Sequence, residues 1–331
     1  MQFGPVAPKD GVGAILAHSI SLSNGRLRKG RILTTDDCAA LLREGHSEVW
    51  IARTGEGDVH EDAAASRLAS ALLSDPESAG VTVGQAATGR VNLHSSRAGV
   101  LTFDTPSVHS LNKADPGITL AVLPPFARVA AGQMIGTVKI IPYAVEEDAL
   151  VVAEAAAARA SLTVRPASVV RVELIETMID RIEFGAKGVR AVKARVEALG
   201  STLAPVRRVP HDVERLAEAI GDTDAGAILI LTASATSDVH DVAPEALRRA
   251  GGHVVRFGMP VDPGNLLFLG EHRGRPVIGL PGCARSPALN GADWVLDRVL
   301  TGLPCGDDEI AAMGVGGLLK ETRARGRPRE A

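Results

Sequence analysis

Aromatic residues and cysteines are scarce in this chain of 331 residues. Six Phe, two Trp and one Tyr leave few rings for the stacking platforms that bind single-stranded nucleic acid. The three cysteines, Cys38, Cys283 and Cys305, are odd in number and far apart, which argues against a disulfide framework and a CxxC zinc site. These absences favour a reducing compartment and a core built from Val, Leu, Ile and Ala.

Long apolar runs and an excess of one charge are also missing. No run of about 18 or more apolar residues occurs, and the first residues lack a basic segment followed by an apolar one. The chain has 36 Lys and Arg against 39 Asp and Glu, a formal net charge of -3, so no general basic field attracts nucleic acid or an anionic membrane. We therefore predict a cytoplasmic protein with no nucleic-acid partner and no membrane partner. Walker A, GxGxxG and HExxH motifs are absent as well.

The length allows more than one domain, and the pattern of residues changes along the chain. Residues 1–78 indicate a small α+β unit, and residues 79–145 indicate a β-rich module of short strands separated by Gly, Pro and Asn. Residues 146–167 contain an alanine-rich helix that we interpret as a helical linker. The charged residues 320–331 are expected to form a disordered tail.

Residues 168–319 alternate strand patterns with helix patterns. This alternation predicts an α/β domain with a doubly wound, mostly parallel sheet covered on both faces. The wholly apolar run 227–231 is typical of a central strand, and residues 287–300 predict the last helix. Ligands bind beyond the carboxyl ends of the strands in such a sheet, so the loops after the first, third and last strands are the candidate site.

The loop after the third strand, residues 232–241, is small and rich in hydroxyl groups. Small residues let backbone amides approach a ligand, and the carboxylate of Asp241 can accept a ligand N–H or bind Mg²⁺. The alternative is an ordinary strand-to-helix loop in which Asp241 caps the helix. Spacing alone does not decide between the two.

The loop after the last strand, residues 281–286, also runs from a strand toward a helix. Amides at a helix start favour phosphate, and Arg285 can add a bidentate clamp. The alternative is a tight turn that needs Gly282, with Ser286 as the helix cap. Cys283 has no paired histidine identifiable in the sequence, so we interpret it as a small apolar space-filler rather than a nucleophile.

Two further features bear on the site. The segment 258–265 is a rigid turn that either aims Asp262 and Asn265 at a ligand or serves only as a connector. In Pro210-His211-Asp212, we interpret Asp212 as a helix cap and His211 as a solvated residue of the first turn rather than a catalytic base.

These loops resemble the molybdopterin-binding domain shared by molybdopterin adenylyltransferases and molybdopterin molybdotransferases. Those families carry a TTGGTG-type loop followed by Asp-Val-Thr-Pro-Glu, matched here by residues 232–236 and by Asp-Val-Ala-Pro-Glu at 241–245. Their Pro-Gly-Lys-Pro turn is matched at 263–265, and their Gly-Leu-Pro-Gly-Asn-Pro-Val-Ser loop at 279–286. The resemblance covers residues 168–301, and its four ordered motifs are specific in combination.

The sequence departs from that pattern at two places. Ala233 and Ser234 replace glycines of the first loop, which reshapes the approach to a ligand. An acidic residue usually follows Val-Pro at the second helix, whereas this chain has His211 there and Asp212 one position later. The resemblance therefore supports binding better than catalysis.

The whole chain is most similar to a bacterial group of molybdopterin-binding proteins, through Arg-Lys-Gly at 28–30, TGRVN at 88–92 and GTVKIIP at 136–142. Members of that group are often fused to a domain resembling molybdenum cofactor cytidylyltransferase. The LAAGxSxRMG loop of such a domain does not occur here, so cytidylyl transfer by this polypeptide is not expected.

The resemblance implies that the chain binds molybdopterin, or its molybdenum-loaded form, in molybdenum cofactor biosynthesis. It would then assist molybdate insertion or nucleotide modification as a transferase of the molybdotransferase type, with Asp241 as catalytic residue and Mg²⁺ ligand, and related proteins suggest a homo-oligomer. The alternative is a non-catalytic carrier that delivers cofactor to a separate cytidylyltransferase or molybdoenzyme; a purely structural or protein–protein role is a third possibility. The residues expected to bind the ligand are Thr177, Thr232, Ala233, Ser234, Ala235, Thr236, Asp262, Asn265, Pro281, Gly282, Cys283, Ala284, Arg285 and Ser286.

Overall fold

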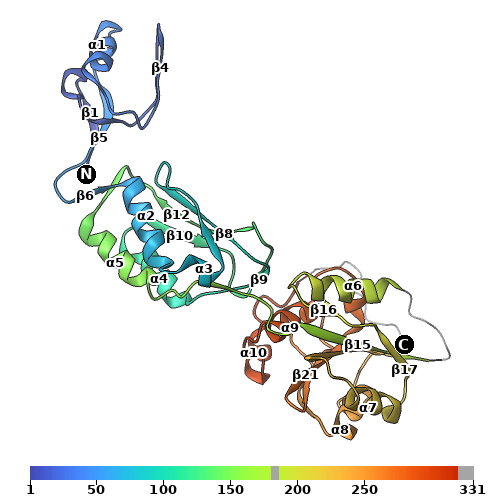
Figure 1. The fold of residues 1–331 in the computed structure, drawn as a ribbon. Coiled ribbons are helices and arrows are strands. Elements are labelled where there is room, and N and C mark those ends of the chain that lie inside the picture. Colours follow the sequence, from blue (N-terminus) through green and yellow to red (C-terminus); the bar gives the residue numbers. More distant parts are fainter. Residues whose placement is uncertain (180–185, 320–331) are drawn as a thin grey trace, which may run out of the picture. The chain divides into compact units, whose positions relative to one another are not determined.

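The computed structural model describes residues 1–179 and 186–319, and its contacts divide the chain into two compact units (Figure 1). The first unit comprises residues 1–97 and 101–164, and the second comprises residues 98–100 and the described residues from 165 onward. The predicted tail, 320–331, lies outside the described residues. No helix within the described part of the chain is both long and apolar enough to span a membrane.

The first unit begins with a small antiparallel sheet of strand order β1-β5-β2 and a separate β3-β4 hairpin. A capping box starts the helix α1: the Thr34 hydroxyl accepts from the Asp37 amide, and the Asp37 carboxylate accepts from the Thr34 amide. Thr34 rather than the neighbouring Thr35 is the cap, because the box needs an acid three residues after the cap. The elements are β1 (Gln2–Val6), η1 (Pro8–Asp10), β2 (Ile15–Leu16), β3 (Ile20–Leu22), β4 (Gly25–Leu27), α1 (Thr35–Arg43) and β5 (Val49–Arg53).

The rest of the first unit is built around an antiparallel sheet of order β10-β12-β8-β7, against which α2 packs. Apolar side chains of this sheet and of α2, α4 and α5 form one hydrophobic cluster. From residue 58 to residue 165 the elements are β6 (Asp58–His60), α2 (Glu61–Leu72), α3 (Pro76–Ala79), β7 (Val81–Val83), β8 (Arg90–Ser95), β9 (Gly99–Thr102), α4 (Thr105–Ala114), β10 (Ile118–Val122), β11 (Arg128–Val129), β12 (Met134–Ile140), β13 (Ala144–Glu146), α5 (Glu147–Ala157) and β14 (Thr163–Arg165).

The expected linker, residues 146–167, is part of this core instead. Its helix α5 buries Leu150, Ala153 and Ala157 in the same cluster as the sheet, and it packs against α2 and α4. A helix with a buried apolar face is held by that burial and does not act as a free connector. The linker prediction is corrected accordingly.

The second unit contains a seven-stranded mixed sheet of order β16-β15-β18-β21-β20-β19, with β17 also paired to β15. The pairs among β15, β16, β17, β18 and β21 are parallel, whereas β20 and β19 add an antiparallel edge. The elements are β15 (Arg171–Met178), α6 (Ala186–Glu197), β16 (Thr202–Leu203), β17 (Arg207–Pro210), α7 (Val213–Gly221), β18 (Ala227–Leu231), α8 (Val242–Arg249), β19 (His253–Phe257), β20 (Phe268–His272), β21 (Arg275–Leu280), η2 (Gly282–Arg285), α9 (Gly291–Leu300) and α10 (Asp307–Ala312).

Helices cover both faces of this sheet. Along β18, Leu229 belongs to a cluster with α6, α9 and α10, whereas Ile228 and Ile230 belong to a cluster with α7 and α8. Successive side chains of a strand point to opposite faces, so these two clusters mark the two sides. Figure 1 shows α7 and α8 on one side of the sheet and α6 and α9 on the other. The mixed α/β fold is confirmed, while the antiparallel edge departs from the predicted pattern.

Candidate functional site

The strand β15 ends in two buried polar residues that occupy the carboxyl edge of the parallel strands. Thr177 is fully buried, and its hydroxyl accepts the Ala233 amide at 2.8 Å and lies 2.9 Å from Nδ1 of His211. Thr177 therefore connects the end of its own strand to the loop after β18 and to the residue that precedes the cap of α7.

Glu176 is 2% exposed and receives two guanidinium groups. Nε of Arg208 lies 3.2 Å from one carboxylate oxygen, and Nη1 of Arg285 lies 3.3 Å from the other. A buried carboxylate is stable only when it is paired, and both oxygens of Glu176 have a guanidinium partner. We call Glu176, Thr177, Arg208, His211 and Arg285 the strand-edge cluster.

Arg285 holds two of the predicted loops together. Its Nη2 donates to the carbonyl of Thr232 at 2.8 Å while its Nη1 reaches Glu176. Gly188 of α6 makes room for it, because a Cβ at that position would lie 3.3 Å from Cγ of Arg285. The loop after β21, the loop after β18 and the end of β15 are thus joined by one side chain.

The loop after β18 has the capping geometry that was the alternative to a ligand role. Asp241 is the N-cap of α8: its two carboxylate oxygens accept the amides of Val242 at 2.7 Å and Ser237 at 3.0 Å. The hydroxyls of Thr232 and Thr236 lie 3.5 Å apart, and the side chains between them, Ser234 and Ala235, are exposed.

The loop after β21 does not run directly into a helix. Residues Gly282–Arg285 form the short turn η2, and α9 begins only at Gly291, where Asn290 is the N-cap in a capping box with Asp293. The predicted helix start at 287 and the predicted cap, Ser286, are therefore wrong. Residues 281–286 therefore do not lie at the N-terminus of a long helix. The dipole of α9 does not reach them, since dipole effects fall off within the first turn.

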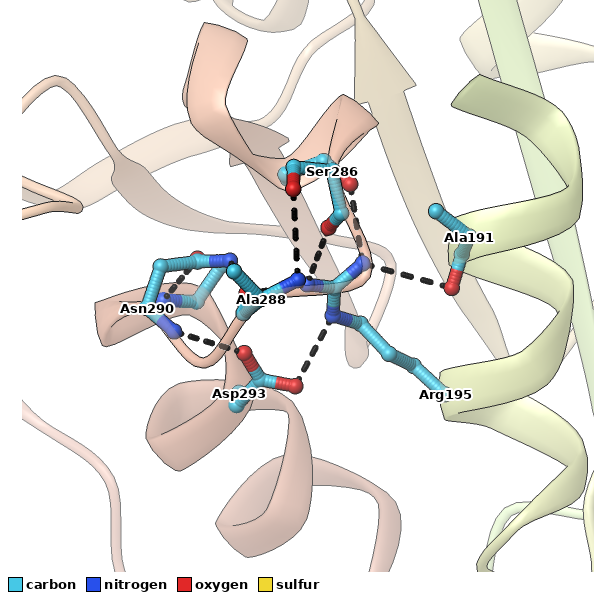
Figure 2. A network of polar contacts seen from close by, with 8 residues as sticks. Ala191, Arg195, Ser286, Ala288, Asn290 and Asp293 are labelled. Carbon is cyan, nitrogen blue, oxygen red and sulfur yellow. Dashed lines mark hydrogen bonds and ion pairs between the residues drawn. The ribbon is translucent and has the colours of Figure 1, made fainter. Parts of the chain in front are cut away.

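A buried arginine from α6 shapes this loop instead (Figure 2). Arg195 is 6% exposed, and its Nε donates to Asp293 at 2.8 Å. Its Nη atoms donate to four carbonyl oxygens, those of Ala191, Ala284, Ser286 and Ala288. One guanidinium thus satisfies four carbonyls and one carboxylate with its donors. We call Arg195, Asp293 and these carbonyls the loop clamp.

Cys283 lies in the turn η2 and is not set up as a nucleophile. Burial raises the pKa of the Cys283 thiol above its ordinary value of 9.0. The thiolate is the reactive form, so a raised pKa keeps the group as a neutral thiol at pH 7. This direction agrees with the prediction that Cys283 fills space.

The predicted turn at 262–265 packs on the start of α9. Gly264 has φ +143, and a Cβ there would lie 2.7 Å from the Gly291 amide nitrogen, so the close approach requires glycine. The same Gly291 amide donates to the carbonyl of Pro263 at 2.8 Å, and the Asp262 amide donates to the carbonyl of Gly317. These contacts fit the connector alternative for the turn, while the ligand roles of Asp262 and Asn265 stay predictions.

The sequence analysis missed Glu176, Arg208, Arg195 and Asp293. Two of these residues carried a signal: Glu176 interrupts an apolar strand, and Arg195 lies on α6 next to the buried Val192 and Val196. A charged residue among buried apolar positions is seldom buried without a partner of opposite charge, so such a residue indicates that a partner exists. The missed partners themselves carried no local signal, because Arg208 lies 32 residues from Glu176 and Asp293 lies 98 residues from Arg195.

A metal site is not assembled at Asp241. Both of its carboxylate oxygens accept backbone amides, and no group of three His, Cys, Asp or Glu side chains able to hold a metal occurs in the described ranges. Mg²⁺ ligands are oxygen atoms from carboxylates, waters and substrate phosphates. The residues described here therefore do not fit a protein-held Mg²⁺ at this position.

The chain is similar to one protein family over part of its length and to solved structures over most of it. Residues 5–53 match a family described as a domain of unknown function (DUF8806). No curated protein matches the chain.

Two solved structures are similar over 92% of this chain at 12% identity. They are a molybdopterin biosynthesis MoeA protein from Pyrococcus horikosii, with a TM-score of 0.28 and 74% of its length covered, and a molybdenum cofactor biosynthesis protein from Pyrococcus furiosus, with a TM-score of 0.25 and 66% covered. The chain thus spans just under two thirds of the second protein's length. At these scores neither likeness carries an argument about fold or function.

Proposed function

We propose that the second unit binds molybdopterin, or its molybdenum-loaded form, as part of molybdenum cofactor biosynthesis. The observation that carries the proposal is Arg285, which joins Glu176 and the Thr232 carbonyl at the edge where the resembling loops meet. The guanidinium groups of Arg208 and Arg285 in the strand-edge cluster suit the phosphate of this ligand, because charge-assisted bonds from Arg to phosphate are strong and directional.

The roles of the flanking loops follow from this placement. Backbone and hydroxyl groups of residues 232–236 would face the pterin, whose edges both donate and accept hydrogen bonds. Residues 281–286 would hold the phosphate with Arg285. The loop clamp supports that role, because the carbonyls of Ala284 and Ser286 are turned toward Arg195.

Isothermal titration with purified molybdopterin under anaerobic conditions tests the proposal. We expect Arg285→Gln to weaken binding about tenfold, since a charge-assisted bond contributes about 1.5–3 kcal/mol. The matched control is Arg249→Gln on α8, an arginine whose side chain is 58% exposed and pairs only at the surface with Glu214. Wild-type affinity in Arg285→Gln, with a far-ultraviolet spectrum equal to that of the control, would refute the site.

A double variant probes the two loops independently of Arg285. We expect Asp241→Ala combined with Ser286→Ala to weaken the same titration, since both lie in the loops that the proposal uses. Undiminished binding by this variant would remove those two loops from the site, even if Arg285 proved necessary.

A non-catalytic carrier is the second candidate function, and two contacts favour it. His211, which stands where the resemblance expects an acid, lies within hydrogen-bond distance of Thr177, and both oxygens of Asp241 accept amides. In this reading the protein presents the cofactor to a separate cytidylyltransferase or molybdoenzyme. A turnover assay with adenylylated molybdopterin and molybdate separates the candidates, because a carrier releases no nucleotide above the protein-free rate.

A further inference from the structure

The first unit contains a cavity of about 430 Å³ that the proposed function does not use. Three segments that are far apart in the sequence line it: Lys29 and Gly30 from the Arg-Lys-Gly element, Thr88 from TGRVN, and Lys139 with the residues after it from GTVKIIP. These are the same three segments through which the whole chain resembles a group of bacterial proteins, and the function proposed above gives them no role.

The backbone around the cavity is built closely. Thr88 has φ +50, and at the adjacent Gly89 a Cβ would lie 2.4 Å from a carboxylate oxygen of Glu61 and 2.6 Å from the Ile140 carbonyl. Only glycine fits there without displacing backbone. This turn directs the Thr88 carbonyl toward Nζ of Lys139, which donates to it.

Positive groups outnumber negative groups among the side chains that line the cavity. Nζ of Lys139 lies 3.5 Å from Glu61, whose side chain is 13% exposed, so that carboxylate is matched by one ammonium group. The Met1 ammonium, also at the cavity, pairs with Asp58 at 2.8 Å. Lys29 is exposed at the rim, and among the described residues no carboxylate forms an ion pair with it. Two lysines thus face the cavity with only one carboxylate between them.

One wall of the cavity is aromatic and exposed. Phe3 lines it at 50% exposure, and its ring centroid lies 5.7 Å from that of Trp50, which is 43% exposed. The chain has only six Phe and two Trp, and exposing both rings side by side costs hydrophobic free energy that a planar ligand would recover. Tyr143 also lines the cavity, and its hydroxyl donates to the carbonyl of Ala17.

We propose that this cavity binds a phosphomonoester of a planar ring. The phosphate, close to a dianion at pH 7, would lie between Nζ of Lys29 and Nζ of Lys139, and the ring would pack on Phe3. A phosphate suits the site better than a carboxylate, because its three terminal oxygens can accept from the ammonium groups of Lys29 and Lys139 together. This site is confined to the first unit and does not depend on the function proposed for the second.

The intact chain and phenyl phosphate as probe provide the test. The variant Trp294→Phe leaves Trp50 as the single tryptophan, so its emission reports on the aromatic wall, and calorimetry gives the affinity. We expect a saturable change with a stoichiometry of about one, and we expect Lys29→Gln to weaken it about tenfold, as loss of a charge-assisted bond predicts. Lys113→Gln on α4, an exposed lysine of the same unit, is the matched control and should bind as the parent does.

Inorganic phosphate and benzoate test the two parts of the proposal, the role of the ring and the role of the phosphate, separately. We expect both to bind at least about tenfold more weakly than phenyl phosphate, because the first lacks the ring and the second has two acceptor oxygens in place of three. Equal affinity for inorganic phosphate would overturn the role of the ring, and equal affinity for benzoate would overturn the preference for a phosphate. Absence of saturable binding, or an unchanged affinity in Lys29→Gln, would overturn the site itself.

Discussion

Arg67 in the first unit and Arg195 in the second each hold two segments of their own unit together, but in opposite surroundings. The Arg67 side chain is 38% exposed and binds Glu147 at 2.8 Å and Glu154 at 2.9 Å, both on α5. The Arg195 side chain is 7% exposed and binds Asp293 and four carbonyls. Arg67 joins two helices that apolar contacts already pack, whereas Arg195 determines the path of a loop.

The difference shows that burial determines how much stability is lost when an interaction is removed. If Arg67 is lost, water can solvate the half-exposed carboxylates that remain, so little free energy changes. If Arg195 is lost, the carboxylate of Asp293 and several carbonyls stay buried without their donors, and each such group carries a desolvation cost. Similar hydrogen-bond distances at the two sites therefore do not imply similar contributions to stability.

Replacing the buried arginine is expected to have the largest effect. We predict that Arg195→Met lowers the free energy of unfolding of the second unit by about 3–5 kcal/mol, the range for breaking a buried ion pair. Urea unfolding followed by Trp294 emission in a Trp50→Phe background measures it. Arg190→Met, at an exposed position one turn earlier on α6, should stay within about 0.5 kcal/mol. A loss below about 1 kcal/mol for Arg195→Met would break the comparison.

Replacing the half-exposed arginine is expected to have a smaller effect. We predict that Arg67→Met lowers the free energy of unfolding of the first unit by about 1 kcal/mol, since exposed pairs contribute little and solvent screens them. Trp50 emission in a Trp294→Phe background reports this unit, with Arg26→Met at the exposed β3-β4 hairpin as control. A loss as large as that of Arg195→Met would show that exposure does not determine how much these two arginines contribute to stability.

The dependence of the free energy of unfolding on pH should also differ between the two units. We expect this effect to be the smallest of the three, because a single imidazole is involved. Burial lowers the pKa of His272, in β20, below its ordinary value of 6.5, so the unfolded chain binds more protons just below that pH. Its contribution to the second unit is therefore complete above pH 6.5 and is lost as the pH falls through the lowered folded pKa.

The first unit should respond only at lower pH. The hydrogen bond from Arg67 lowers the pKa of Glu147 below its ordinary value of 4.5, so that contribution is present above pH 4.5 and is lost below it. Urea unfolding between about pH 7 and pH 5, read from Trp294 and from Trp50 in the two single-tryptophan variants, compares the units. His272→Leu should flatten the Trp294 profile. Parallel profiles for the two reporters would contradict the prediction.

Much of the second unit could be predicted from the sequence because its patterns are local. The apolar run Ala227–Leu231 is a central strand as expected, and Asp212 caps α7 as expected, since both depend on residues within one element. The prediction failed at the last helix, where the chain makes the turn η2 and starts α9 only after Asn290. A capping box of Asn290 and Asp293 forms that start, and Arg195, about ninety residues earlier, donates to the carbonyls of the loop before it.

The sequence by itself determined which segments alternate between strand and helix, and that the loops near Thr232 and Arg285 lie at strand ends. Hydrophobic periodicity, caps and turn residues act within a few positions, so these features can be read without a fold. Only the tertiary structure decided that Arg285 reaches Glu176, that Asp241 is held as a cap, and that Lys29 and Lys139 line one cavity. Pairings across such sequence distances depend on strand order and packing, and neither is encoded in the local pattern.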